Sequence, residues 1–206
     1  MSGGSEGLDI FYPIVPDVDW LRRIVPLGVR TVQLRLKNVP SDEIRHGIGE
    51  SLEICIRCNC QLIVNDYWRE AIAVGADYIH LGQEDLAAAD VETIKAHGLR
   101  LGISTHSPEE LEIALAAEPD YIALGPIYET KLKVMKWAPQ GLDRIAVWKR
   151  RIGDLPLVAI GGLTPERADG IVAAGADSLA VITDFLTYPD PEGRIGTWLA
   201  WAERMR

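Results

Sequence analysis

Short apolar segments alternate along the chain with longer segments in which apolar residues recur at helical spacing. The short segments are rich in β-branched and aromatic residues, which is typical of buried strands. They predict strands at residues 11–15, 31–37, 62–64, 78–81, 99–103, 121–124, 157–160 and 178–182. The longer segments predict helices at residues 18–27, 41–59, 68–74, 86–96, 108–117, 142–152, 165–174 and 195–205.

The boundaries between these elements carry signals of their own. Ser107-Pro108 and Thr164-Pro165 each place a capping side chain before a proline, which favours the start of a helix. Gly75-Ala76-Asp77 returns as Gly175-Ala176-Asp177 where a predicted helix gives way to a strand, and glycine suits the left-handed end of a helix. The chain therefore repeats a unit of one strand and one helix.

Eight such units in 206 residues predict a single (β/α)8 TIM barrel with parallel strands and a C-terminal helix. We expect one domain over residues 1–206, with residues 1–8 flexible. A doubly wound open sheet is the alternative, but the first strand lacks the glycine-rich turn of dinucleotide-binding sheets. Near the C-terminus, Trp198 and Trp201 cover either the barrel or a second subunit, so homo-oligomerisation is left open.

Composition and charge exclude several classes of protein. Hydrophobic residues make up 48% of the chain, and the net charge of −9 argues against a general nucleic-acid surface. No segment approaches the roughly 18 apolar residues of a membrane span. The polar start, Met1 to Gly7, contains no apolar signal region. We expect a cytoplasmic protein whose partners are neither nucleic acids nor membranes.

Three cysteines, Cys55, Cys58 and Cys60, lie close together in the sequence. A metal or redox role is one interpretation. Three thiols without a nearby histidine make poor zinc geometry, and an odd number fits no disulfide framework. Reduced thiols at a helix end and a strand start are the favoured interpretation, in agreement with a cytosolic compartment.

Polar residues follow several predicted strands, where barrel enzymes place their active sites. Asn65 and Asp66 follow the third strand, and Asp85 comes shortly after the fourth. Two carboxylates converging there suit a hard cation such as Mg²⁺, which takes oxygen ligands and often binds substrate phosphates. The alternative is that Asn65 and Asp66 only cap the following helix.

The second predicted strand ends with two cations. Strand alternation places Gln33, Arg35 and Lys37 on one face, with Leu34 and Leu36 on the other. Cations at the mouth of an acidic protein are costly unless an anion meets them, and arginine and lysine bind phosphates. A solvated strand end is the alternative interpretation.

Later segments add a second set of candidate contacts. Ser104 offers a hydroxyl suited to a phosphate or a ring substituent. The long basic segment at residues 125–140, which contains Lys133, is either a functional loop or a disordered basic tip. Gly162 and Thr183 follow the last two strands, where barrels often bind phosphate. Two anion sites suggest two phosphorylated substrates, and no Cys–His or Ser–His pair suggests a covalent nucleophile.

In these motifs the chain resembles thiamine phosphate synthase, also called thiamine-phosphate pyrophosphorylase. The shared motifs occur in the same order along nearly the whole chain. They are residues 33–37 (QLRLK), 65–66 (ND), 80–85 (HLGQED), 104–106 (STH), 125–128 (GPIY), 138–141 (APQG) and 159–162 (AIGG).

The resemblance implies an Mg²⁺-dependent transferase of thiamine biosynthesis that joins 4-amino-2-methyl-5-hydroxymethylpyrimidine diphosphate to 4-methyl-5-(2-phosphooxyethyl)thiazole. Diphosphate leaves, a pyrimidine-methyl cation forms, the thiazole nitrogen captures it, and thiamine phosphate results. The implied contacts to the pyrimidine diphosphate are Gln33, Arg35, Lys37, Asn65, Ser104 and Lys133, and those to the thiazole phosphate are Thr130, Gly162, Ile182 and Thr183. The implied catalytic residues are Arg35, Lys37, Ser104 and Lys133, and the implied Mg²⁺ ligands are Asp66 and Asp85.

Two positions depart from the Pro-Thr-x-Thr-Lys pattern of the resembled family. Glu129 stands in place of the proline and Leu132 in place of the second threonine. A carboxylate beside a phosphate is unfavourable unless a cation such as Lys131 offsets it. Two other functions stay open: a thiazole tautomerase of the same superfamily with His106 as its base, and a non-catalytic barrel that binds thiamine precursors and regulates another process.

Overall fold

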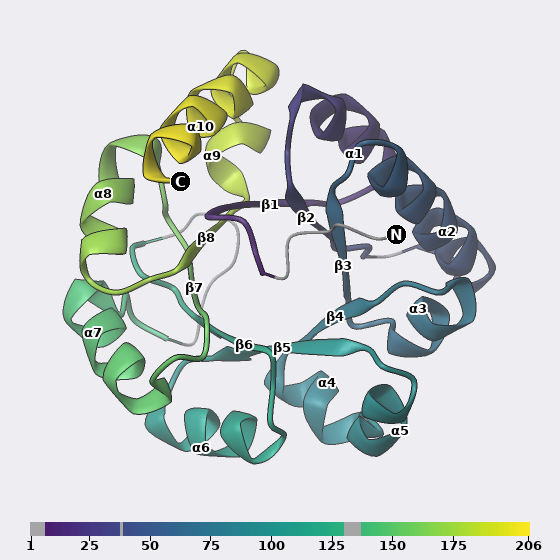
Figure 1. The fold of residues 1–206 in the computed structure, drawn as a ribbon, viewed down its shortest axis with the longest axis horizontal. Coiled ribbons are helices and arrows are strands. Elements are labelled where there is room, and N and C mark those ends of the chain that lie inside the picture. The colour runs from purple at the N-terminus through teal and green to yellow at the C-terminus, as the bar shows by residue number, and fades with distance from the viewer. Residues whose placement is uncertain (1–6, 38, 130–136) are drawn as a thin grey trace.

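Eight parallel strands close into a barrel in the order in which they occur along the chain (Figure 1). The structure is a computed structural model that describes residues 7–37, 39–129 and 137–206. The strands are β1 (Phe11–Val15), β2 (Thr31–Leu34), β3 (Gln61–Asn65), β4 (Tyr78–Leu81), β5 (Arg100–Thr105), β6 (Tyr121–Leu124), β7 (Leu157–Ile160) and β8 (Ser178–Val181). The (β/α)8 prediction is confirmed, and the doubly wound alternative is wrong.

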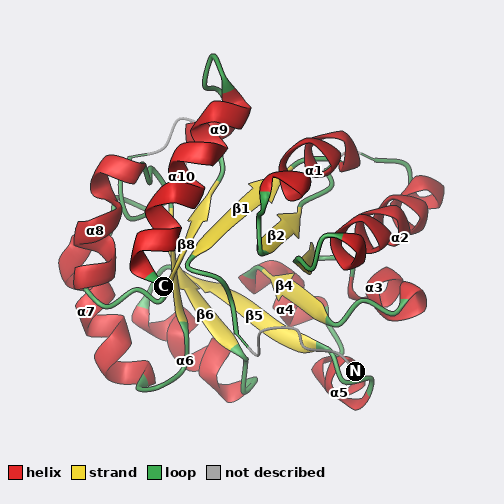
Figure 2. Ribbon diagram, turned by 45° about the horizontal axis from the view of Figure 1, so that its top comes forward, coloured by secondary structure: helices red, strands yellow, loops and turns green. Residues whose placement is uncertain are grey.

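Helices surround the barrel on its outside, as Figure 1 and Figure 2 show. In the described ranges, no helix has the length and apolar character needed to cross a membrane. The helices are α1 (Val18–Ile24), the 3-10 helix η1 (Val25–Leu27), α2 (Ser41–Arg57), α3 (Trp68–Val74), α4 (Gln83–Ala88), α5 (Val91–Ala96), α6 (Pro108–Ala116), α7 (Gly141–Ile152), α8 (Pro165–Ala173), α9 (Thr183–Leu186) and α10 (Pro191–Met205).

Three of the differences from the predicted elements concern segments that carry candidate site residues. β2 ends at Leu34, so the two cations beyond it lie in a loop. The helix predicted over residues 86–96 is two helices, because the backbone is extended at Ala89 and the Asp90 carboxylate caps α5 by accepting a hydrogen bond from Thr93 N at 3.0 Å. The short helix α9 after β8 was not predicted.

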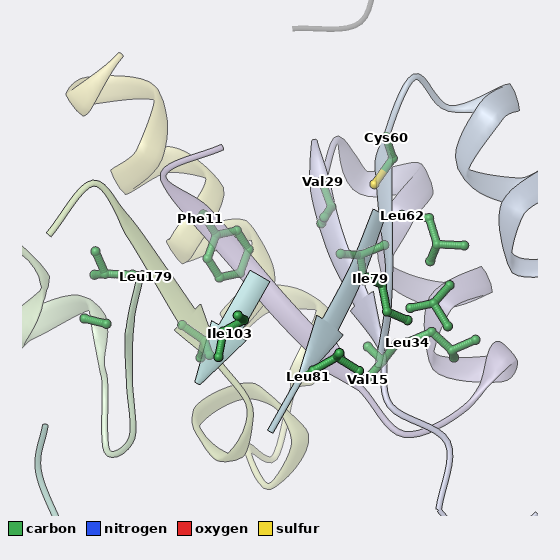
Figure 3. Close-up of a cluster of buried hydrophobic side chains, with 14 of the residues drawn as sticks. Phe11, Val15, Val29, Leu34, Cys60, Leu62, Ile79, Leu81, Ile103 and Leu179 are labelled. Carbon is green, nitrogen blue, oxygen red and sulfur yellow. The ribbon is translucent and has the colours of Figure 1, made fainter. Parts of the chain in front are cut away.

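Strand side chains alternate between two apolar layers, as strand geometry requires. The outward layer packs between the strands and the helices, and Figure 3 shows part of it, including Phe11, Leu62, Ile79, Ile103 and Leu179. The inward layer fills the barrel. It consists of Tyr12, Ile14, Ile63, Tyr78, Tyr121, Ala123, Val158 and Ala180.

The C-terminal helix α10 packs against the barrel. Trp198 is fully buried, and its ring stacks on that of Phe11 at a centroid distance of 5.2 Å. Trp201 is also buried, and its indole N–H donates to Asp169 Oδ1 at 2.7 Å. Of the two interpretations of this segment, packing on the barrel is the one that the structure supports.

The three cysteines are free thiols. Cys55 and Cys60 are buried and Cys58 is exposed, and Figure 3 shows Cys60 among the side chains of the outward layer. Contact with the Cys55 thiol and burial both raise the pKa of Cys60, so this thiol stays protonated and unreactive at neutral pH. This arrangement agrees with the interpretation as reduced thiols at a helix end and a strand start.

Candidate functional site

The candidate site begins where β3 ends. Asp66 adopts the left-handed backbone region with φ of 68°, which is uncommon for a residue other than glycine. The conformation is fixed locally, because Asp66 N donates to His80 O of the neighbouring strand at 3.0 Å and Trp68 N donates to Asp66 O at 2.9 Å. Backbone strain of this kind costs on the order of 1–3 kcal/mol and persists where surrounding bonds enforce it.

Lys37 and Asp85 both lie against the Asp66 carboxylate. Lys37 Nζ is 2.6 Å from Asp66 Oδ2. Asp85 comes from the first turn of α4, and its carboxyl lies within hydrogen-bonding reach of that of Asp66. Partial burial, together with the neighbouring Asp66 charge, raises the pKa of Asp85. The structure therefore brings the two carboxylates together beside one cation.

This pair of carboxylates fits a hard divalent cation. Burial and the charge of Asp66 both raise the pKa of Asp85, and a cation between the two carboxylates would relieve their mutual repulsion. Among the described residues there is no group of three or more His, Cys, Asp or Glu side chains that could hold a metal ion. Two carboxylates still suit Mg²⁺, which usually keeps several waters and shares its remaining positions with substrate phosphates.

Gln33 occupies the position that strand alternation predicts, whereas Arg35 lies in the loop beyond the end of β2. Gln33 is 2% exposed and points into the barrel, where its amide N donates to Tyr12 Oη at 2.6 Å. Leu34 and Leu36 lie in the outward layer. The Arg35 side chain is exposed, while its backbone N–H donates to Val15 O at 2.9 Å.

Ser104 is hydrogen-bonded to a histidine inside the barrel. His80 Nε2 lies 2.8 Å from Ser104 Oγ, and His80 Nδ1 lies 2.7 Å from Tyr121 Oη. Burial lowers the pKa of His80 to about 4, so its ring is neutral at pH 7. The sequence did not indicate this Ser–His contact, which forms because β4 and β5 are neighbours and both side chains point inward.

His80, Tyr12 and Tyr121 are the buried polar residues that sequence reasoning missed as parts of the site. A signal for His80 was present, since alternation along β4 places Tyr78 and His80 on the same, inward face. No local signal pairs His80 with residues on other strands. Asn65 lies opposite His80 in the sheet and is 6% exposed, which places it at the inner edge of the same region.

The ends of β7 and β8 form the other side of the site. Ile160 pairs with Ala180, so the segments that follow these two strands lie next to each other. Gly162 has φ of 65°, and a Cβ there would come within 2.6 Å of Glu129 O. Glycine is thus required at this position by close approach of the loop after β6.

The helix after β7 begins three residues beyond Gly162. Gly162 does not open α8, which begins at Pro165 with Thr164 as its N-cap. Thr183 is the first residue of α9 and Ile182 is its N-cap. These residues still lie at the carboxyl ends of β7 and β8, as predicted from the sequence.

His106 is placed differently from the residues above. Its Nδ1 lies 2.8 Å from Glu110 Oε2, and its ring stacks on Trp137 at a centroid distance of 5.8 Å. It therefore belongs to the segment around α6 and not to the barrel interior. The remaining predicted contacts, Thr130 and Lys133, lie outside the described residues, as do Lys131 and Leu132.

Fold and site together define a class: a (β/α)8 barrel with acids, cations and hydrogen-bonding groups gathered where barrel enzymes bind their substrates. Comparison with known proteins is more specific. The sequence model of the family described as thiamine monophosphate synthase matches residues 11–185. The chain is 58% identical to a thiamine-phosphate synthase of Rhizobium etli over 193 residues, covering 94% of this chain and 95% of that protein.

Other relatives agree. A thiamine-phosphate synthase of Citrobacter koseri is 47% identical over 172 residues, covering 84% of this chain and 82% of that protein. The structure of a thiamine phosphate pyrophosphorylase from Pyrococcus furiosus matches with a TM-score of 0.81 and 26% identity, covering 96% of each chain. The chain belongs to the thiamine monophosphate synthase family. It is an enzyme of thiamine biosynthesis, which confirms the resemblance and rules out the non-catalytic alternative.

Proposed function

We propose that this enzyme transfers the pyrimidine-methyl group of 4-amino-2-methyl-5-hydroxymethylpyrimidine diphosphate to the nitrogen of 4-methyl-5-(2-phosphooxyethyl)thiazole. The products are thiamine phosphate and diphosphate. The observation that carries the proposal is the cluster of Lys37, Asp66 and Asp85, next to the inward-facing Gln33 and Ser104. In this cluster, Lys37 offers a positive charge to the diphosphate, and the two carboxylates offer negative charges to a cation bound with it. Gln33 and Ser104 offer hydrogen bonds to the pyrimidine ring.

Asp66 and Asp85 would hold Mg²⁺, and Mg²⁺ so bound would stabilise negative charge on the departing diphosphate. Lys37 reaches the same place from the loop after β2, with Nζ at 2.6 Å from Asp66 Oδ2. Its side chain is 46% exposed, which leaves it free to turn toward a phosphate. Arg35, which is also exposed on that loop, adds a second cation, and its guanidinium group can donate two hydrogen bonds to one phosphate.

Departure of diphosphate without a protein nucleophile is consistent with the interior of the barrel. His80 is neutral, has a pKa of about 4, and is therefore a poor base for activating Ser104. We assign Ser104 and Asn65 to binding the pyrimidine diphosphate. A dissociative reaction then needs only charge stabilisation of the leaving group and correct placement of the thiazole nitrogen.

We assign the thiazole phosphate to the ends of β7 and β8. Gly162, Ile182 and Thr183 lie there on neighbouring segments. The loop after β6 packs on Gly162 through Glu129 O, so this loop adjoins the same place. Thr130 and Lys133, which lie outside the described residues, complete the proposed contacts to the two substrates.

The test mixes both phosphorylated precursors with the enzyme and follows diphosphate and thiamine phosphate, with Mg²⁺ and with Mg²⁺ removed by a chelator. We expect both products only with Mg²⁺, and a loss of about 100-fold in kcat/KM for Asp85→Asn. Glu84→Gln is the matched control, because Glu84 is the neighbour of Asp85 on α4 and is likewise exposed. Equal rates for the two variants would contradict the assignment of Asp85.

The same reaction mixture distinguishes the proposed transferase from a thiazole tautomerase. A thiazole tautomerase would isomerise the thiazole without consuming the pyrimidine diphosphate, and His106→Ala would abolish that activity. We expect His106→Ala to retain diphosphate release, because His106 pairs with Glu110 and stacks on Trp137 away from the barrel interior. Tautomerisation in the absence of diphosphate release would favour the alternative.

A further inference from the structure

Five side chains are hydrogen-bonded in series across the interior of the barrel. Gln33 Nε2 donates to Tyr12 Oη at 2.6 Å, and Tyr12 Oη lies 3.0 Å from Tyr121 Oη. Tyr121 Oη lies 2.7 Å from His80 Nδ1, and His80 Nε2 lies 2.8 Å from Ser104 Oγ. The three inner members, Tyr12, Tyr121 and His80, are at most 7% exposed.

The first bond sets the direction of every other bond in the series. An amide nitrogen only donates, so Tyr12 Oη accepts from Gln33 and its own hydrogen goes to Tyr121. Tyr121 then accepts from Tyr12 and donates to His80 Nδ1. A neutral imidazole that accepts at Nδ1 carries its hydrogen on Nε2, and this hydrogen goes to Ser104 Oγ.

We infer that Tyr12, Tyr121 and His80 are positioning residues that fix which groups of the candidate site donate and which accept hydrogen bonds. At one end of the series the Ser104 hydroxyl accepts from His80, so its own hydrogen is directed to a ligand. At the other end the Gln33 amide nitrogen is engaged, and no donor of the described residues reaches Gln33 Oε1, which is left as an acceptor. The candidate site thus presents a donor at Ser104 and an acceptor at Gln33, both at fixed places.

This arrangement is the reverse of a catalytic Ser–His pair. In a serine-nucleophile triad the acid accepts from Nδ1–H and Nε2 accepts the serine proton. In the direction inferred above, Nδ1 accepts from Tyr121 and Nε2 donates to Ser104, over distances of 2.7 and 2.8 Å. The low pKa of His80 agrees, because a ring that resists protonation cannot take up the serine proton. Ser104 is therefore a ligand donor and not a nucleophile.

The fold reserves space for this series. A Cβ on Gly102 would lie 2.0 Å from Tyr121 Cζ. Glycine at this position of β5 therefore leaves room for the tyrosine ring. The Tyr121 ring is nearly parallel to the His80 ring, with an interplanar angle of 17° and a centroid distance of 5.5 Å. Tyr12 and Tyr78 both meet the Tyr121 ring edge-on. These contacts hold the Tyr121 hydroxyl in place.

The consequence for the ligand rests on the proposed function. A ring amine donates, so it matches Gln33 Oε1, whereas a ring nitrogen or phosphate oxygen accepts and so matches the Ser104 hydroxyl. An aminopyrimidine fulfils both requirements. In the analogue with an oxo group in place of the amine, the oxo oxygen and Gln33 Oε1 would both be acceptors, so no hydrogen bond could form between them. The fixed polarity would therefore select an aminopyrimidine over an oxopyrimidine.

The first experiment is independent of any substrate. Ring nitrogens of ligand-free protein labelled with ¹⁵N-histidine are observed by NMR, and the signals of His80 are identified as those lost in His80→Gln. We expect a neutral His80 with hydrogen on Nε2. Tyr121→Phe and Tyr12→Phe should each shift His80 to a mixture of tautomers, because each removes a hydroxyl of the series. Tyr78→Phe is the matched control. Hydrogen on Nδ1 in the parent protein, or no response to Tyr121→Phe, would overturn the inference.

The second experiment connects the series to the substrate. Tyr121→Phe is expected to raise KM for the pyrimidine diphosphate about tenfold and to leave KM for the thiazole phosphate unchanged, the size expected for weakening one hydrogen bond to a ligand. The parent enzyme is expected to reject the oxo analogue, and the variant to discriminate less. An unchanged KM would refute the role in recognition. If the parent protein released no diphosphate, the proposed function would fail while the NMR result stood.

Discussion

Arg194 on α10 joins the two helices that begin beside the proposed thiazole-phosphate site. Its Nε and Nη2 donate to the two Asp184 oxygens at 2.8 and 2.9 Å, and its Nη1 donates to Glu166 Oε1 at 3.1 Å. Trp198 Nε1 donates to Asp184 Oδ2 at 2.8 Å. Asp184 lies on α9 and Glu166 on α8, and Figure 1 shows α10 lying over α9 and beside α8.

Arg194→Met should therefore lower the free energy of unfolding substantially. The side chains of Arg194 and Asp184 are 11% and 9% exposed, so the substitution leaves a buried carboxylate without its cation. Removing one partner of a buried pair costs about 3–5 kcal/mol. We expect about 3 kcal/mol, at the lower end of this range, because the Trp198 indole N–H still donates to Asp184.

Urea denaturation measures this change without adding ions that screen the pair. Adding Asp184→Asn to Arg194→Met should recover about 1–2 kcal/mol, since the unpaired charge is then removed. Lys95→Met is the control: Lys95 is 37% and its partner Glu118 83% exposed, and such pairs contribute at most about 1 kcal/mol. A loss below about 1 kcal/mol for Arg194→Met would refute the reasoning.

Three further predictions follow from single contacts. The hydrogen bond from Arg194 lowers the pKa of Glu166 from 4.5 to about 2. The contribution of Glu166 to stability is therefore present above about pH 4.5 and is lost as the pH falls toward 2. Glu166→Gln should weaken the dependence of the melting temperature on pH over this interval, and an unchanged dependence would contradict the prediction. Gly162→Ala should raise KM for the thiazole phosphate, because the new Cβ would lie 2.6 Å from Glu129 O at a φ of 65°; steady-state kinetics with each substrate varied would test this, and an unaffected KM would count against the site. A thiol reagent should modify Cys58 alone in the folded protein, since it is the exposed one of the three free thiols; mass spectrometry showing a second modified cysteine would disprove it.

Local sequence signals predicted most of the fold. Ser107 before Pro108 opens α6, and the Ser107 hydroxyl accepts from Glu110 N as expected of an N-cap. Short continuous apolar segments predicted the strands, because a barrel strand is buried on both faces. The split between α4 and α5 was missed, since the Asp90 cap lies inside a segment that keeps helical periodicity.

The sequence by itself determined the alternation that turns Gln33 inward, and it identified the acids and cations that follow the strands. Tertiary structure alone decided which of these side chains meet. Closure of the barrel brings His80 against Ser104, and the left-handed turn at Asp66 lets a carboxylate from β3 meet one from α4. The physical reason is one of range: capping and alternation act between residues a few positions apart, whereas these contacts depend on strand register and on helices packing across the whole barrel.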